Sequence, residues 1–243
     1  MIKLSASSIG TYEKCPKKYH YQYIEKPPIP PQDWSHLEFG KCAHRVLELF
    51  HKDLCDNIRD PSEYSGLMKT SFKLALEEFD MDILKPELPA LKEVLQVYLN
   101  KIMQDGLPQV IANELNFDFK IGEYTVRGFI DRIDKISPGH YKVVDYKTNK
   151  NPKYLSNFQL LLYALAIKEI YKDVEKISGC YVLLKNKCDT LEYSFGEEDY
   201  QDTIDKVLRV GKSIDTSVEW EKKPSILCNW CDFQSLCQNS WDV

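Results

Sequence analysis

The sequence predicts a mixed α/β fold in which a β-sheet follows a largely helical first half. Apolar residues recur at helical spacing between Leu37 and Leu54, and residues 62–84 and 89–105 also have helical patterns. Three consecutive segments within residues 111–148 are strand-like and are separated by short turns. Because a further helix and strand follow, we expect a mixed α/β core with a helical insertion.

The remaining elements follow from short stretches of sequence. Serines in "SASSIGTYEK" are suited to capping a helix, and four prolines within residues 26–34 favour a stiff, extended connector. Later patterns predict a helix at 157–171, strands at 177–185 and 190–195, and a closing helix at 197–216. The expected organisation has four parts, an N-terminal segment, a helical region, a core and a cysteine-bearing tail: residues 1–34, 35–110, 111–217 and 218–243.

Composition limits the class of protein. The 243 residues carry a net charge of -5, so the whole surface is not suited to coating nucleic acid. Two local segments are basic, since residues 1–26 hold five lysines against two glutamates and residues 138–154 hold four lysines against one aspartate. No apolar run is long enough for a membrane span or a secretory signal, and we expect a cytoplasmic protein. In that compartment the eight cysteines favour metal ligation over disulfides.

An acid and a base end the strand-like run "YKVVDYKT". Side chains alternate along a strand, so Asp145 and Lys147 are expected on one face. Asp131 in "GFIDRID" belongs to the preceding strand and can converge with Asp145 if the two strands pair. Two close carboxylates repel each other, and a divalent cation relieves that repulsion. The alternative is an exposed ion pair and a carboxylate at a strand end, which would contribute little.

Further candidates come from the elements on either side. Glu114 lies on the strand before Asp131, and His44 lies at the border of the apolar stripe of its helix. Gln159 and Tyr163 are four residues apart, hence on one face of an otherwise apolar helix. Each has an ordinary explanation as a surface position. A competing metal site would use two further residues on the side of the helix that carries His44: Glu48 and His51.

The order of these motifs, "FG...H", a strand glutamate, "GFIDRID", "DYKT" and "Q...Y", resembles the RecB-like branch of the PD-(D/E)XK nuclease superfamily. The resemblance implies a restriction-endonuclease-like mixed sheet flanked by helices. It implies that His44, Asp131 and Asp145 bind Mg²⁺ or Mn²⁺, and hard cations of this kind do prefer oxygen ligands. Lys147 would be the catalytic lysine. The residues that would complete the site are Glu114, Gln159 and Tyr163.

The tail contains three cysteines in "CNWCDFQSLC": Cys228, Cys231 and Cys237. Three thiolates are an incomplete tetrahedral set, so a fourth ligand is needed. The resemblance to iron–sulfur members of the branch, the AddB-type nucleases and the exonucleases of CRISPR adaptation, implies Cys15 and a [4Fe–4S] cluster that clamps the chain ends. Zinc remains an alternative, because spacing alone does not separate the two metals. The other four cysteines are expected to be small buried or surface residues, with Cys42 also an alternative ligand: Cys42, Cys55, Cys180 and Cys188.

The resemblance implies a metal-dependent DNA nuclease, an exonuclease that prefers single strands or frayed ends. CRISPR adaptation, recombination or repair, and phage replication are all open as pathways. The sequence contains no phosphate-binding loop of the G-x-x-x-x-G-K-[ST] type, so unwinding would require a helicase, and an integrase-type protein is another possible partner. Two rival hypotheses are a catalytically inactive DNA-binding or assembly module and a zinc-ribbon interaction protein.

Overall fold

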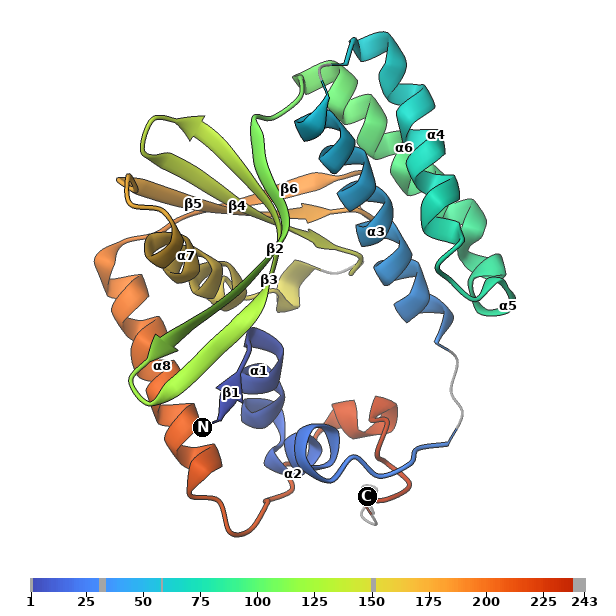
Figure 1. Cartoon of the computed structure of the whole chain (residues 1–243). Helices are drawn as coiled ribbons and strands as arrows, with labels where there is room; N and C mark the ends of the chain where they lie inside the picture. The colour runs from blue at the N-terminus through green and yellow to red at the C-terminus, as the bar shows by residue number, and fades with distance from the viewer. Residues whose placement is uncertain (1, 31–33, 58, 150–151, 238–243) are drawn as a thin grey trace. The chain divides into compact units, whose positions relative to one another are not determined.

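The computed structural model describes residues 2–30, 34–57, 59–149 and 152–237 (Figure 1). The chain forms two compact units. One comprises three segments, Met1–Gln32, Asp118–Gly128 and Tyr200–Val243, and the other comprises Asp33–Phe117 and Phe129–Asp199. All the nuclease candidates of the sequence lie in the second unit, whereas all four cluster candidates lie in the first.

The strands form a mixed sheet with the order β1-β3-β4-β5-β6, and β2 also pairs with β3. The β3–β4 and β5–β6 pairs are antiparallel, whereas the β1–β3 and β4–β5 pairs are parallel. The strands are β1 (Lys3–Leu4), β2 (Val110–Ile121), β3 (Tyr124–Ser137), β4 (His140–Lys147), β5 (Lys176–Leu183) and β6 (Asp189–Ser194). Each expected strand is therefore present, and the expected mixed sheet flanked by helices is confirmed.

In the second unit, helix α7 (Phe158–Ile170) packs against β4 and β5 (Figure 1). Eight of its residues are buried, which explains why its sequence is apolar on nearly every side. Other side chains of the same two strands join the helical core on the opposite sheet face, because neighbouring strand residues point in opposite directions. These strands are thus covered on both faces, which accounts for their continuous apolar runs.

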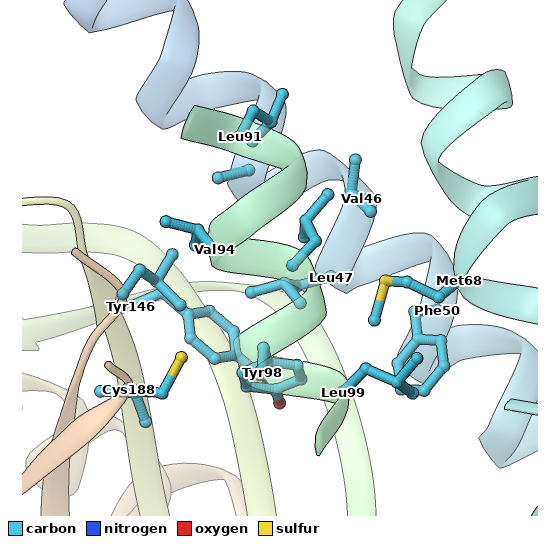
Figure 2. Packing of buried hydrophobic residues seen from close by; sticks show 14 of the residues in the cluster. Val46, Leu47, Phe50, Met68, Leu91, Val94, Tyr98, Leu99, Tyr146 and Cys188 are labelled. Atoms are coloured by element: carbon cyan, nitrogen blue, oxygen red, sulfur yellow. Dashed lines mark hydrogen bonds between the residues drawn. The ribbon is translucent and has the colours of Figure 1, made fainter. Parts of the chain in front are cut away.

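The helical part of the second unit consists of three longer helices, α3 (Ser35–Asp56), α4 (Tyr64–Leu76) and α6 (Leu88–Asp105). Figure 2 shows how their apolar side chains meet those of the sheet, with Val46, Leu47 and Phe50 among the contributors from α3. The expected helix over 62–84 is wrong in part, because the chain turns after α4. There the side chain of Asp80 accepts a hydrogen bond from the amide of Asp82 and starts the short helix α5 (Met81–Leu84). Three 3₁₀ turns complete this unit: η2 (Pro61–Glu63), η3 (Lys85–Glu87) and η4 (Pro152–Tyr154).

In the first unit, Ser5 and Ser8 form a capping box at the start of α1 (Ala6–Lys14). Helix α2 (Pro16–Tyr19) follows, and the π-helix η1 (His20–Glu25) continues from it. Residues 26–30 of the expected connector have no regular structure, and residues 31–33 lie outside the described part of the chain. The last elements of the chain are α8 (Glu197–Asp215) and the 3₁₀ turn η5 (Ile226–Trp230).

Candidate active site

Two aspartates face each other across the β3–β4 pair. The antiparallel register joins Arg132 to Val144, which places Asp131 and Asp145 opposite each other on one sheet face. Their exposed fractions are 8% and 2%. Burial raises the pKa of Asp145, and the negative charge of Asp131 adds to this effect. The structure therefore brings together the two carboxylates that the sequence predicted to converge.

A group of potential metal ligands forms around Asp131. One ligand atom from each of His44, Glu114 and Asp131 lies within 4.8 Å of the other two. The closest described contact joins His44 Nδ1 to Asp131 Oδ2 at 3.3 Å. Gly40 lies one turn before His44 on α3, and a Cβ atom there would be 3.4 Å from Thr148 Oγ1. Helix α3 thus approaches the end of β4 closely and carries the imidazole to the carboxylates.

The group carries more negative than positive charge. Burial, and after it the negative charge of Asp131, raise the pKa of Glu114 to about 7. Burial opposes protonation of His44, but the neighbouring carboxylates outweigh it and raise the pKa of His44 to about 9. The charge of Asp131 contributes to both shifts, although burial is the larger cause for Glu114. A bound cation would relieve the repulsion between the carboxylates.

Glu114 reaches this group through an unusual backbone conformation. Its φ of 44° lies in the left-handed region, although Glu114 is inside strand β2 and is not glycine. Such a conformation is strained for a residue with a side chain, and residues of this kind concentrate at functional sites. The motif order marked Glu114 as a candidate, but alternation predicts only an ordinary strand position and not this backbone conformation.

Lys147 belongs to a ring of polar contacts beside the two aspartates. Its Nζ atom lies 2.6 Å from Asp145 Oδ2 and donates a hydrogen bond to Gln159 Oε1 at 2.8 Å. Gln159 Nε2 donates to Tyr163 Oη at 2.6 Å, and that hydroxyl donates to Asp145 Oδ1 at 3.3 Å. The face of α7 that carries Gln159 and Tyr163 thus meets the face of β4 that carries Asp145 and Lys147. The ring fixes the ammonium group of Lys147 against one carboxylate.

A pocket of about 760 Å³ opens at this group. Charged and polar side chains of α3 form much of its wall, while Thr148 and Asn149 extend it beyond the end of β4. Its lining residues are His36, Leu37, Gly40, Lys41, His44, Arg45, Glu48, Glu114, Asp131, Thr148, Asn149 and Lys185. The three potential ligands therefore face a space that a ligand can enter.

A second polar cluster, which the sequence reasoning missed, lies behind the first. Arg132 binds both carboxylate oxygens of Asp134, at 2.8 and 2.9 Å, and donates to the hydroxyls of Tyr98 and Tyr146, at 2.7 and 2.8 Å. The amide of Tyr146 donates to Asp131 Oδ2 at 2.8 Å, and its ring contacts that of His44 edge to face. Figure 2 shows Tyr98 and Tyr146 at the edge of the apolar core. Alternation could have revealed this cluster, because Arg132 and Asp134 share the face opposite Asp131.

The competing ligands of α3 are engaged elsewhere. His51 is fully buried, and its Nε2 atom lies 2.6 Å from the hydroxyl of Tyr98. Glu48 pairs with Arg45 at 2.7 Å. Burial raises the pKa of Cys42 to about 11, so its thiol stays protonated. Within the part of the chain that is described, none of these three residues joins a ligand group.

The four cysteines that were predicted to hold a metal cluster all lie in the first unit. Burial raises the pKa of Cys237, and the charges of three other thiolates, those of Cys15, Cys231 and Cys228, raise it as well against the opposing charge of Lys222. Two sulfurs also accept backbone hydrogen bonds at 3.4 Å, Cys15 Sγ from Lys18 and Cys228 Sγ from Ser225. Of the remaining cysteines, three are buried and Cys55 is exposed, as expected.

The fold and this site define a class of protein. The profile of the PD-(D/E)XK nuclease superfamily matches residues 3–238, and the chain belongs to this superfamily. Its mixed sheet flanked by helices matches a solved structure of a candidate exonuclease from Eubacterium rectale. That match has a TM-score of 0.54 and 14% identity, and covers 99% of this chain and 90% of the other. This likeness concerns the fold alone.

Curated relatives give a more specific similarity. The chain is 28% identical over 236 residues to a subunit of the ATP-dependent helicase/deoxyribonuclease of Streptococcus pyogenes serotype M1, and 27% identical to the corresponding subunit of serotype M12 (strain MGAS2096). Each alignment covers 90% of this chain but spans only 22% of the relative. Among the described helices, none is both long and apolar enough to cross a membrane.

Proposed function

We propose that this nuclease hydrolyses phosphodiester bonds of DNA with a divalent metal ion. The observation that carries the proposal is the proximity of His44, Glu114 and Asp131, within 4.8 Å, in a pocket on the strand pair that also carries Asp145 and Lys147. DNA is favoured as the substrate because the similar streptococcal proteins are named as deoxyribonuclease subunits.

The donor set fits Mg²⁺ or Mn²⁺. The group offers one nitrogen, from His44, and carboxylate oxygens from Glu114 and Asp131, a set suited to hard cations. The negative charge of the carboxylates exceeds the positive charge of the group, and a bound cation would balance it. Asp145 is the fourth potential ligand, and its carboxylate also contacts Lys147. When bound, the ion would acidify water and stabilise negative charge on a phosphate oxygen.

The chain's own residues would position the reactants. Lys147 would orient the attacking water and stabilise the charge that develops on the phosphate. Gln159 and Tyr163 hold the ammonium group in place, since their hydrogen bonds connect it back to Asp145. The pocket would admit the scissile phosphate beside these groups.

Substitution of the strand residues tests the proposal. Asp145→Ala and Lys147→Ala proteins should lose Mg²⁺- or Mn²⁺-dependent cleavage of end-labelled DNA. Lys142→Ala is the matched control, because Lys142 lies on the same strand and pairs with Glu192 at 3.1 Å, away from the site. Equal cleavage by all these variants and the parent would reject the proposed site. Binding without any cleavage by the parent would favour an inactive DNA-binding module.

We further propose a preference for single-stranded or frayed ends and exonuclease action on strands that a helicase has opened. The similar streptococcal proteins are subunits of a helicase/deoxyribonuclease, and this chain matches only 22% of their length. Substrates labelled at either end, single-stranded, duplex or frayed, would test the preference. Internal cleavage of circular single strands would contradict exonuclease action.

We also propose that Cys15, Cys228, Cys231 and Cys237 hold a [4Fe–4S] cluster. The charges of Cys15, Cys231 and Cys228 act on the pKa of Cys237, which supports proximity of the sulfurs, and the two N–H···S hydrogen bonds suit cluster thiolates. Anaerobically purified protein should be brown and contain iron and sulfide. Colourless protein that contains zinc would contradict this proposal.

A further inference from the structure

Lys185 lies at the pocket, two residues beyond the end of β5. The parallel register joins Lys147 of β4 to Leu183 of β5, and the amide of Leu184 donates to the carbonyl of Lys147 at 2.8 Å. The chain therefore leaves both strands at the same sheet edge. Lys185 lines the same pocket as Thr148 and as the potential metal ligands.

The ammonium group of Lys185 is held in place without a close anion. Its Nζ atom lies 3.8 Å from the centroid of the Phe39 ring, which is fully buried. The carboxylate nearest to it among the described ion pairs is that of Glu87, at 4.0 Å. The side chain is only 19% exposed, so the charge is partly removed from water. A phosphate oxygen could supply the close partner that Glu87 does not.

The longer basic side chains of the pocket differ from Lys185. Lys41 pairs with Glu38 at 2.7 Å. Arg45 pairs with Glu48 and with Glu78, each at 2.7 Å. Their charges are balanced at short range, whereas Lys185, which lines the same pocket, has its nearest described carboxylate at 4.0 Å.

We propose that Lys185 binds a phosphate of the substrate strand that neighbours the phosphate to be cleaved, an inference that rests on the proposed function. The pocket already holds the carboxylates of Glu48, Glu114 and Asp131, which repel a polyanionic strand. A partly desolvated ammonium on the same wall offsets that repulsion. Its contribution is to substrate binding, and the reacting atoms are handled by other side chains.

Three variants separate the charge from the packing of Lys185. Lys185→Met keeps an unbranched side chain against Phe39 and removes the charge, whereas Lys185→Arg keeps the charge. Lys101→Met is the matched control, because Lys101 pairs with Asp105 at 3.6 Å and does not line the pocket. We expect Lys185→Met to raise KM for a single-stranded oligonucleotide by about 5- to 20-fold, with kcat within about twofold of the parent. Lys185→Arg and the control should stay within about threefold of the parent KM.

Binding of the single-stranded oligonucleotide is measured separately by fluorescence anisotropy with Mg²⁺ present. Each variant is made in a protein that also carries Lys147→Ala, so that the oligonucleotide is not cleaved. The plot of log affinity against log salt should become shallower by about 0.7 when Lys185 is changed to Met, as expected for one lost phosphate contact on a single strand. Equal affinity and equal salt slopes for Lys185→Met and Lys101→Met would overturn the proposal. The result stands apart from catalysis, because a parent protein that never cleaves would reject the nuclease function while the binding data still decide the role of Lys185.

Discussion

Two polar clusters lie on opposite faces of the β3–β4 pair, and their charge balance differs. On one face, the guanidinium of Arg132 meets both oxygens of Asp134 and two tyrosine hydroxyls. On the other face, three carboxylates, Glu114, Asp131 and Asp145, share Lys147 and an imidazole. Neighbouring residues of one strand, Asp131 and Arg132, thus belong to clusters of different kinds.

The difference separates a structural cluster from one that is prepared for a ligand. A buried ion pair with all its hydrogen bonds made has no need of a further ion. Burial, together with the negative charge of Asp131, raises the pKa values of Glu114 and Asp145, so these carboxylates tend to retain protons. The first cluster supports the second, since Tyr146 connects Arg132 to both Asp131 and His44.

The largest expected effect comes from Asp131→Asn. This change keeps an acceptor for the amide of Tyr146 but removes a charge from the potential ligand group. We expect kcat/KM for DNA cleavage to fall on the order of 10³-fold, and the melting temperature in EDTA to stay equal or rise because repulsion is removed. Cleavage within tenfold of the parent would place the metal elsewhere.

Asp134→Asn should have the opposite pattern. It leaves the buried charge of Arg132 without its anionic partner, and we expect the free energy of unfolding to fall by about 3–5 kcal/mol. Urea unfolding measures the change. The control is Asp118→Asn at an exposed position of β2, which should change the free energy of unfolding by no more than about 0.5 kcal/mol. Similar losses for Asp134→Asn and Asp131→Asn would remove the distinction between the clusters.

Tyr146→Phe tests the connection between them. The ring contact with His44 is kept while the hydroxyl that accepts from Arg132 is lost. We expect Mn²⁺ affinity, measured by calorimetry, to fall by about tenfold through weaker positioning of Asp131 and His44. A Tyr98→Phe protein is the control, because Tyr98 bonds the same guanidinium but makes no described contact with either ligand. Equal losses of Mn²⁺ affinity in both variants would indicate that any disturbance of the Arg132 cluster weakens the site, and would contradict a specific role of Tyr146.

The pH dependence of stability is the smallest expected effect. The folded pKa of Glu114, about 7, and that of His44, about 9, both lie above the ordinary values of 4.5 and 6.5. The raised pKa of Glu114 therefore stabilises the folded protein fully below pH 4.5, and this contribution is lost as the pH rises through 7. The contribution from the raised pKa of His44 is lost in the same way between pH 6.5 and 9. In EDTA, the melting temperature should fall by roughly 3–6 °C between pH 6 and 9 relative to a Glu114→Gln, His44→Ala protein. If melting temperature depended on pH in the same way in both proteins, the raised pKa values of Glu114 and His44 would be contradicted.

Periodicity was sufficient to predict most of the fold. The 3.6-residue repeat predicted α3, and alternation placed Asp145 and Lys147 on one face, where they form a 2.6 Å ion pair. The four-residue spacing of Gln159 and Tyr163 likewise predicted one helix face, and the two side chains do bond each other.

Other features depend on tertiary structure or on local backbone geometry. The left-handed φ of Glu114 leaves no trace in an alternating strand sequence, so its approach to His44 was uncertain from sequence. The cluster around Asp134 also depends on tertiary structure, because its partner Arg132 donates a hydrogen bond to Tyr98 of α6 as well. The end of α4 was missed because the helical apolar pattern runs past the cap at Asp80.

The carboxylate-rich cluster, and not the balanced one, is proposed to take up a divalent cation. Anomalous diffraction from crystals of the protein soaked in Mn²⁺ locates the ion directly. We expect one peak at about 2.0–2.3 Å from ligand atoms of His44, Glu114 and Asp131. A protein that cleaves DNA with Mn²⁺ but shows its bound ion away from these three side chains would rule out this metal site.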